Sequence, residues 1–292
     1  MPGLLFNLQK LIVLIFALIF PDKYPDTINV FIHGTQMSRI IFGKSKNKQK
    51  GLVHYSQLPA KNFRLRFPAI LNKKCPANYP LSTFYMFNWS GNLRFKSREK
   101  AALQLYKELD ALAKKHELKY KIYPKIRLIT HSHGGNVALN LAKIKPTNGC
   151  LKIHEAILLA CPVQAETKSF TQDPMFENII SIYSSLDWIQ ILDPQGFYEI
   201  SKGKGVPFFS ERKFKSTDKL CNIKVRLNKK GLKHIDFLRT KFINKIPEII
   251  ELAYSKRSKK LENIDLYLTL NKNEKNSLEQ DAKELAQIIA GH

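Results

Sequence analysis

One segment constrains this chain more than any other: residues 126–136, Ile-Arg-Leu-Ile-Thr-His-Ser-His-Gly-Gly-Asn. An apolar run typical of a strand meets Ser132 between two histidines, and an apolar stretch with helical spacing follows two glycines. A strand, a tight turn with serine at its apex and a helix are the parts of a nucleophile elbow. Such a turn needs small residues around the serine. Gly134 and Gly135 supply them on one side, whereas Thr130 stands where glycine is usual on the other. The alternative is an ordinary serine in a glycine-containing β–α turn.

The rest of the chain alternates between strand-like and helical segments. The apolar runs that predict strands lie at 27–35, 83–91, 126–131, 152–161, 178–184 and 223–227. Apolar residues at helical spacing predict helices over 98–116 and 240–255, and a last helix from Ser277. This alternation predicts an α/β fold, with a mainly parallel central sheet flanked by helices on both faces.

We expect three parts along the chain. Residues 1–22 form a hydrophobic signal-like or anchor segment, residues 23–255 an α/β domain, and residues 256–292 a basic linker and C-terminal helix. Within the domain, residues 36–80 are polar, lysine-rich and punctuated by proline, which predicts a long loop. Long connections of this kind are usually functional, and this one is a candidate lid.

The N-terminus is strongly apolar. Residues 11–20 are unbroken hydrophobic, follow Lys10 and end at Pro21. Ten residues are too few to span a bilayer, but a basic residue before such a run resembles a secretory signal or signal anchor. We therefore expect export or membrane tethering. The alternatives are a buried first element of the domain and a cytoplasmic protein.

The chain is strongly basic, with 48 Lys and Arg against 24 Asp and Glu and a formal net charge of +24. This charge favours an anionic membrane surface as a partner. Nucleic acid is disfavoured, because the lysines are scattered and no zinc-finger or aromatic RNA-binding pattern is present. An AT-rich genome would also produce such a composition. The four cysteines form no CxxC pair, which argues against structural zinc.

A serine hydroxyl is a poor nucleophile, so it needs a base within hydrogen-bonding reach and a carboxylate that orients the base. Asp187 follows the strand predicted at 178–184, and His234 follows the strand predicted at 223–227 by a short Lys/Gly loop. The order Ser132, Asp187, His234 is the order of the triad in one common α/β fold and differs from other common triads.

Other residues compete for these roles. Asp193 is an alternative acid, but it precedes a proline and is typical of a turn. Asp236 follows His234 too closely to orient it easily, and it is a candidate for a local helix start. We expect His131 to pack beneath the sheet and His133 to line a cleft. The two histidines diverge at such a turn, so we expect no metal.

The oxyanion of an acyl-transfer reaction needs two backbone N–H donors aimed at it. One should be the amide of His133, directly after the serine. The other should come from the turn His33-Gly34-Thr35-Gln36 that ends the first strand. Gly34 allows a close backbone approach, and Thr35 or Gln36 then supplies the amide.

Together these motifs resemble the α/β-hydrolase superfamily over about residues 27–240, and most closely its lipase- and serine-esterase-type members. The chain also carries a Phe-x-Trp-Ser-Gly segment that such members have, here Phe87 to Gly91. The resemblance implies hydrolysis of a carboxylic ester or related acyl bond without a cofactor. His33, Gly34, Trp89 and Ser90 are the candidate substrate-binding residues. Trp89 and its neighbours end a strand beside the nucleophile strand, where they would line an acyl pocket, but the core is the favoured place for Trp89 itself.

The hypothesis is therefore a serine hydrolase that cleaves a lipid-like carboxylic ester through Ser132, His234 and Asp187. A catalytically silent scaffold that binds a partner or membrane surface is one alternative, and an amidase or peptidase on the same fold is another. The fold alone does not decide between them.

Overall fold

In the described part of the chain, nine strands form one sheet. The computed structural model describes residues 26–35, 50–59, 63–144, 151–191, 213–257 and 263–268. The strands follow one another across the sheet in the order β2-β3-β1-β4-β5-β6-β7-β8, and β9 pairs with β7. Their bounds are β1 (Thr27–Ile32), β2 (Gly51–His54), β3 (Phe84–Asn88), β4 (Lys125–His131), β5 (Glu155–Leu159), β6 (Ile179–Tyr183), β7 (Leu220–Leu227), β8 (Lys230–Gly231) and β9 (Asn263–Leu268).

The sheet is mainly parallel, as predicted. Strands β3, β1, β4, β5, β6 and β7 pair in parallel, while β2 on β3 and β8 on β7 pair antiparallel. The carboxyl ends of the parallel strands therefore meet at one edge, which is where open α/β sheets bind ligands.

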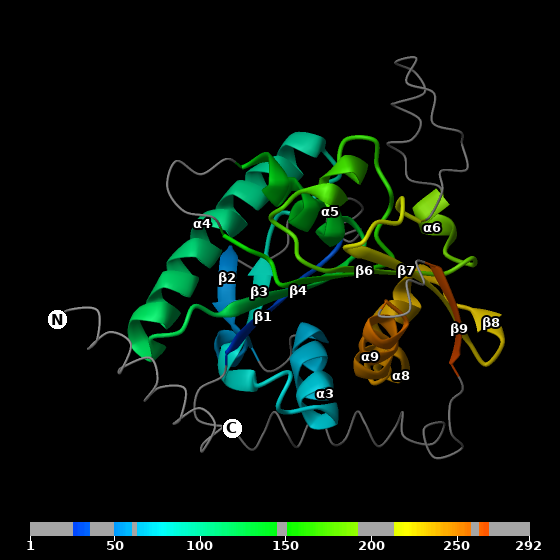
Figure 1. The fold of residues 1–292 in the computed structure, drawn as a ribbon, viewed down its shortest axis with the longest axis horizontal. Helices are drawn as coiled ribbons and strands as arrows, with labels where there is room; N and C mark the ends of the chain where they lie inside the picture. The colour runs from blue at the N-terminus through cyan, green and yellow to red at the C-terminus, as the bar shows by residue number, and fades with distance from the viewer. Residues whose placement is uncertain are drawn as a thin grey trace.

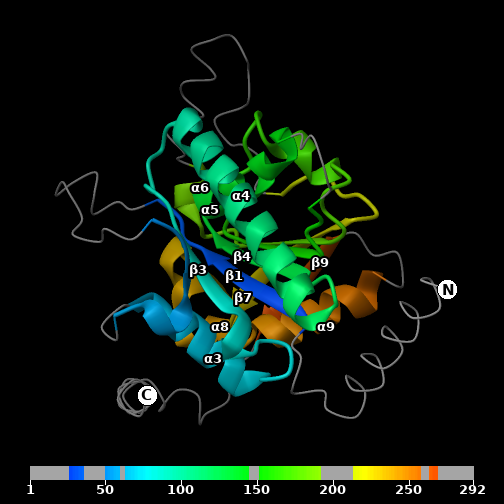
Figure 2. The ribbon, with the colours of Figure 1, turned by 90° about the vertical axis from the view of Figure 1, so that its left-hand side faces the viewer.

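Helices cover both faces of the sheet. They are α3 (Arg66–Lys74), α4 (Phe95–Tyr120), α5 (His133–Leu139), α6 (Trp188–Ile191), α8 (Thr240–Ile243) and α9 (Ile246–Arg257), with short 3-10 turns η1 to η6 between elements. Figure 1 shows α4 and α5 above the sheet and α3, α8 and α9 below it. The side view in Figure 2 shows the same separation. None of the helices in the described residues is both long and apolar enough to cross a membrane.

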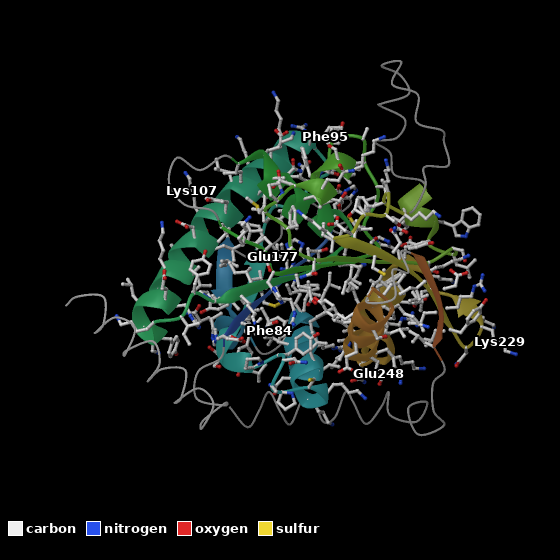
Figure 3. The ribbon with its side chains drawn as sticks, viewed as in Figure 1. Phe84, Phe95, Lys107, Glu177, Lys229 and Glu248 are labelled. Atoms are coloured by element: carbon white, nitrogen blue, oxygen red, sulfur yellow. The ribbon has the colours of Figure 1, made fainter. Side chains whose placement is uncertain are left out.

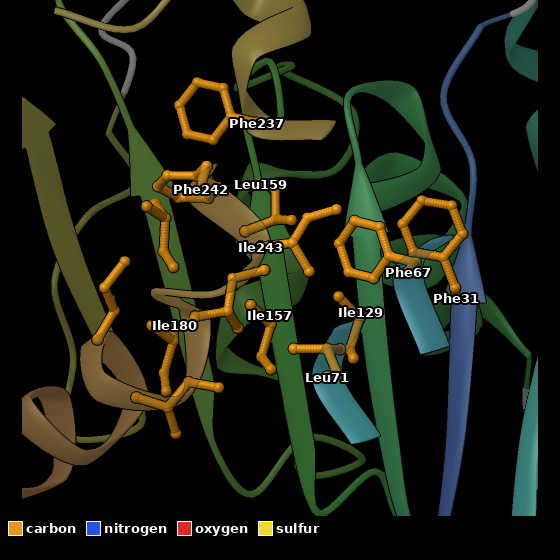
Figure 4. Packing of buried hydrophobic residues seen from close by; sticks show 14 of the residues in the cluster. Phe31, Phe67, Leu71, Ile129, Ile157, Leu159, Ile180, Phe237, Phe242 and Ile243 are labelled. Carbon is orange, nitrogen blue, oxygen red and sulfur yellow. The ribbon is translucent and has the colours of Figure 1, made fainter. Parts of the chain in front are cut away.

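Two apolar layers hold the helices to the sheet. Along β1 and β4, Phe31 and Ile129 belong to the layer between the sheet and α3, α8 and α9. Val30 and Leu128 belong to the layer between the sheet and α4 and α5. Figure 4 shows the first layer, in which side chains of the strands meet those of the helices. A parallel sheet that is covered on both faces needs such nearly continuous apolar strands.

The long helix predicted at 98–116 is present as α4. Its residues Ala102, Leu105 and Leu109 are completely buried at helical spacing against the sheet. The helix is longer than predicted at both ends, where none of the added residues is buried, so they do not continue the apolar stripe that marks the rest of the helix.

The loop predicted at 36–80 is a correction, because much of this region is ordered into β2, η1 (Tyr55–Gln57) and α3. In α3, Phe67, Ile70 and Leu71 are buried, and Phe67 stacks on Phe31 with ring centroids 4.3 Å apart. Pro68 lies in the first turn, where proline is tolerated. Residues 36–49 and 60–62 lie outside the described residues.

The boundary expected at residue 255 is also revised, because β9 lies within the region 256–292. Ile264 and Leu268 are buried, while Asp265 and Tyr267 are exposed, which is the alternation of a strand with one covered face. The domain therefore continues past residue 255. The expected N-terminal segment 1–22 and the helix from Ser277 lie outside the described residues.

Candidate active site

The predicted elbow is present between β4 and α5. Ser132 occupies the turn with φ 54° and ψ −134°, a conformation that is strained for a residue other than glycine. Its N–H donates to the Leu159 carbonyl at 2.8 Å, and its own carbonyl accepts from the Gly135 N–H at 2.9 Å. The neighbouring strand β5 thus helps to hold the serine in this conformation.

Two glycines make the elbow possible. A Cβ atom on Gly134 would collide with the Ile32 carbonyl oxygen of β1, and one on Gly135 would collide with the Cys161 sulfur. Thr130, two positions before the serine, stands where glycine is usual. Its side chain is completely buried, and its hydroxyl donates to the Ile157 carbonyl at 3.2 Å. The departure from the usual pattern is therefore absorbed by a hydrogen bond to β5.

Asp187 and His234 meet at the carboxyl edge of the sheet. Asp187 follows β6, and His234 begins the 3-10 turn η6 (His234–Leu238). The His234 Nδ1–H donates to the Asp187 Oδ2 at 2.8 Å, with the Asp187 side chain completely buried and that of His234 13% exposed. A histidine that donates from Nδ1 to a carboxylate keeps Nε2 available as a proton acceptor.

The two histidines beside Ser132 connect the elbow to His234. The His131 and His234 rings lie with centroids 4.7 Å apart, and the His131 Nε2–H donates to the His234 carbonyl at 3.0 Å. Burial and the nearby His234 lower the pKa of His131 to about 3. Burial, Arg98 and His234 likewise lower the pKa of His133 to about 3. Both rings are therefore neutral near pH 7, and His234 lies beside the Ser132 turn. His131 packs on His234 as well as within the core, and His133, expected to line a cleft, is only 5% exposed.

The turn after β1 packs directly on the elbow. A Cβ atom on Gly34 would lie 2.7 Å from the Ser132 Cβ and 2.9 Å from the His131 carbonyl oxygen, closer than real side chains allow. His33 fixes this turn through a hydrogen bond from its Nδ1–H to the Gly34 carbonyl at 2.7 Å. Thr35 follows within the described residues, and Gln36 lies outside them.

Trp89 supports the same turn from behind. Its indole N–H donates to the His33 carbonyl at 2.7 Å, and the two rings stack at 5.8 Å. Only 5% of Trp89 is exposed, so its contacts are those of the core, while Ser90 next to it is exposed. No contact in this structure tests the predicted substrate role of either residue.

Asp236 does not orient His234. Its carboxylate accepts from the Lys233 N–H at 2.9 Å and forms an ion pair with Arg239 at 3.0 Å. It thus caps η6, the local helix start for which it was a candidate. The other competing acid, Asp193, lies outside the described residues.

No protein-family model matches the chain, and no curated protein matches its sequence. Among solved structures, the Pyrococcus furiosus esterase Pf2001 aligns over 81% of this chain and 82% of its own, at 14% identity and a TM-score of 0.40. The hyperthermophilic esterase from the archaeon Pyrobaculum calidifontis aligns over 92% of this chain and 75% of its own, at 11% identity and a TM-score of 0.38. Identities and TM-scores this low do not carry an activity over to this chain.

The chain's own topology decides the fold. Six parallel strands run in the order β3-β1-β4-β5-β6-β7, and a strained serine elbow joins the third of them to its helix. The chain has the α/β-hydrolase fold. In this fold the triad order along the chain is serine, acid, histidine, which is the order of Ser132, Asp187 and His234 here.

Two further residues of the hydrolase fold were missed by sequence reasoning. Ser184, completely buried at the end of β6, accepts from the Leu232 N–H at 2.7 Å and from the Leu186 N–H at 3.3 Å. It therefore ties the loop that carries Asp187 to the loop that carries His234. In the sequence it was simply the last residue of the strand predicted at 178–184.

The second missed residue is Arg98, which is completely buried near the start of α4. Its guanidinium donates to the Leu93 carbonyl at 2.5 Å and to the Gln164 Oε1 at 3.0 Å. It joins the segment after β3 to the segment after β5, on either side of the elbow. In the sequence it was one more basic residue on a predicted helix.

Proposed function

We propose that this protein is a serine hydrolase that cleaves a carboxylic ester through an acyl-enzyme formed on Ser132. The observation that carries the proposal is the hydrogen bond between Asp187 and His234, made at the sheet edge that also holds the strained Ser132 turn. These two residues are 47 positions apart in the chain. A buried carboxylate, a histidine oriented by it and a serine at the apex of a strained turn are the three parts of nucleophilic acyl transfer.

In the first step, His234 Nε2 takes the proton of the Ser132 hydroxyl as its oxygen attacks the ester carbonyl carbon. The carbonyl oxygen becomes an oxyanion, which the amides of His133 and Thr35 would stabilise, with Gln36 as the alternative to Thr35. Losing one such donor typically costs about a hundred- to a thousandfold in rate. The amide of His133 opens α5 and so has no intrahelical partner to compete for it.

In the second step, the tetrahedral intermediate collapses and the bond between the carbonyl carbon and the alcohol oxygen breaks. The protonated His234 gives its proton to the departing alcohol. Water then attacks the acyl-enzyme while His234 accepts its proton. Collapse of that intermediate returns the proton to Ser132 and releases the acid. Asp187 stays ionised and holds the histidine in its Nδ1–H form throughout.

We propose a lipid-like ester as the substrate class. The net charge of +24 and the apolar run at 11–20 support a substrate found near anionic membranes. This substrate assignment is independent of the triad, so the two are tested separately.

The test is burst release of p-nitrophenol from p-nitrophenyl esters of increasing chain length. Wild type should release about one equivalent per chain before steady turnover, and Ser132→Ala should release none. Ser255→Ala, an exposed serine of α9 on the opposite face of the sheet, is the matched control and should keep the burst. The matching p-nitroanilides separate ester from amide preference.

Four results would count against the proposed nucleophile, activity or substrate class. Turnover that survives in Ser132→Ala would place the nucleophile elsewhere. Inertness of wild type towards every ester, with and without lipid vesicles, would favour the silent-scaffold alternative. Preference for the anilides would favour an amidase. Rates that fall steadily as the acyl chain lengthens would refute the lipid-like substrate class and leave the serine hydrolase proposal standing.

A further inference from the structure

Large apolar side chains are exposed on both loops that carry the acid and the base. Leu186 is 42% exposed, Trp188 59%, Ile189 60% and Ile235 55%. The first three flank Asp187, and the fourth directly follows His234. Helix α6 and the turn η6 contact each other, so these residues, which we call the apolar rim, belong to neighbouring elements.

The polarity of the first three residues of α6 is the reverse of that of an ordinary surface helix. Gln190 is 2% exposed and donates from its side-chain amide to the Cys161 carbonyl at 2.9 Å. Trp188 and Ile189, in the same turn, face outward instead. A surface helix normally buries its apolar side chains and exposes its polar ones. Exposed large apolar groups beside a site mark a surface that contacts another apolar phase.

The charges around the apolar rim are basic. Lys229, Lys230 and Lys233 are exposed on the β7–β8 hairpin and the loop that follows it. Figure 3 shows Lys229 at the outer end of this hairpin. The hairpin packs on the rim, because a Cβ atom on Gly231 would lie 2.7 Å from the Leu186 side chain.

The acidic groups of the same loops are neutralised by partners. Asp187 is completely buried and bonded to His234. Asp236 is paired with Arg239 and accepts from the Lys233 N–H. The exposed charge beside the apolar rim is therefore positive. Apolar groups that insert among acyl chains, ringed by lysines that attract headgroups, match an anionic lipid surface.

We infer that the apolar rim is the surface through which this protein docks on an anionic lipid bilayer. Docking there would bring the loops of Asp187 and His234, and with them the Ser132 turn, against the lipid. This inference rests on the proposed function in one respect, because it makes the apolar rim the place where an ester substrate would enter the site. The docking itself is a binding event and is measured without any turnover.

The test is co-sedimentation of the full chain with phosphatidylglycerol vesicles and with phosphatidylcholine vesicles, at low and high salt. Wild type should bind the anionic vesicles at least about tenfold more tightly, and added salt should weaken this binding. Trp188→Ser with Ile189→Ser should weaken it about tenfold or more, because two large apolar groups no longer leave water.

Leu118→Ser is the matched control, since Leu118 is 73% exposed near the C-terminal end of α4. That end of α4 lies on the opposite side of the molecule from α6 (Figures 1 and 2). The control should bind vesicles as wild type does. Melting temperatures of all variants are measured alongside, and Ile235→Ser repeats the test from the second loop if the double variant unfolds.

Tryptophan emission gives a second readout. The chain has two tryptophans, and Trp89 is buried whereas Trp188 is exposed. Anionic vesicles should shift the emission to shorter wavelength, and lipids brominated in the acyl chain should quench it. Both effects should disappear in Trp188→Phe.

Two results would count against the inference. Vesicle binding that is equal in wild type and in the rim variants would place the lipid contact elsewhere, including the apolar run at 11–20. Equal binding to both vesicle types would show that the lysines beside the rim do not contribute to docking. Vesicle binding through the rim by a chain that turns over no dissolved ester would support docking and refute the proposed function, so the two failures are distinguishable.

Discussion

The Asp187 Oδ2 accepts a hydrogen bond from the His234 Nδ1–H at 2.8 Å, across 47 residues of chain and between two loops at one sheet edge. The carboxylate is completely buried, and a second hydrogen bond, from the Gln190 N–H to Oδ1 at 3.3 Å, fixes its plane. This contact sets the tautomer of His234 and therefore decides which of its nitrogens faces the Ser132 turn.

Replacing Asp187 by Asn should lower kcat about a thousandfold or more, because the amide no longer selects the Nδ1–H tautomer. Steady-state kinetics on a dissolved p-nitrophenyl ester would measure the loss. In Asp236→Asn, which alters the neighbouring carboxylate that caps η6, kcat should fall by no more than about tenfold. Equal losses in the two variants would contradict the assignment of Asp187 as the orienting acid.

Ser184→Ala should reduce both activity and stability. The Leu232 and Leu186 amides would lose their buried acceptor, which costs about 1–3 kcal/mol of unfolding free energy. Because Ser184 acts through the two loops, kcat should fall while KM for a short ester changes little, and Ser184→Cys should restore part of kcat.

Ser181→Ala is the control for this experiment, since Ser181 is a buried serine within β6, three positions before Ser184. Urea unfolding would compare the stabilities of the variants. A purely structural role for Ser184 would appear as equal kcat in the folded fraction of both alanine variants.

The candidate triad could be predicted because it depends on local signals. The elbow at Ser132 has a strand before it and glycines after it, and Asp187 and His234 each follow an apolar strand. In a parallel sheet the carboxyl ends of strands share one edge, so the topology brings these positions together. The hydrogen bond between Asp187 and His234 is the contact that this reasoning predicted.

The missed features depend on contacts between distant segments. Ser184 and Leu232 are 48 residues apart, and Arg98 and Gln164 are 66 apart. Neither pair has a local pattern that distinguishes it from ordinary loop or helix residues. Helix α3 was missed for another reason. It is short, and Pro68 and two lysines interrupt the helical spacing of its buried residues Phe67, Ile70 and Leu71.

Gly34→Ala should disable the site with only moderate loss of stability. The new methyl group would need to displace Ser132 or the His131 carbonyl, which no flexible side chain relieves. Activity should fall at least about a hundredfold, the loss expected when an oxyanion donor is misplaced. Overpacking of this kind costs about 1–3 kcal/mol of stability.

Gly231→Ala is the comparison for Gly34→Ala. Its Cβ atom would also be crowded, at 2.7 Å, but against the partly exposed Leu186 side chain, which has room to move. The loss of kcat/KM should therefore be clearly smaller than for Gly34→Ala. Wild-type rates in Gly34→Ala would show that the turn after β1 plays no part in the reaction.

The two buried histidines beside Ser132 should make the fold sensitive to acid. Their folded pKa values are lowered to about 3 from 6.5, so between these values the unfolded chain binds more protons than the folded chain. The contribution of these two neutral rings to the unfolding free energy is therefore complete above about pH 6.5, and it is lost as the pH falls towards 3. Each histidine contributes up to about 1.4 kcal/mol per pH unit in this window. The unfolding free energy, measured by urea unfolding from pH 8 to pH 4, should fall less steeply with decreasing pH for His133→Gln than for wild type. A His133→Gln slope equal to that of wild type would mean that this ring is already protonated in the fold.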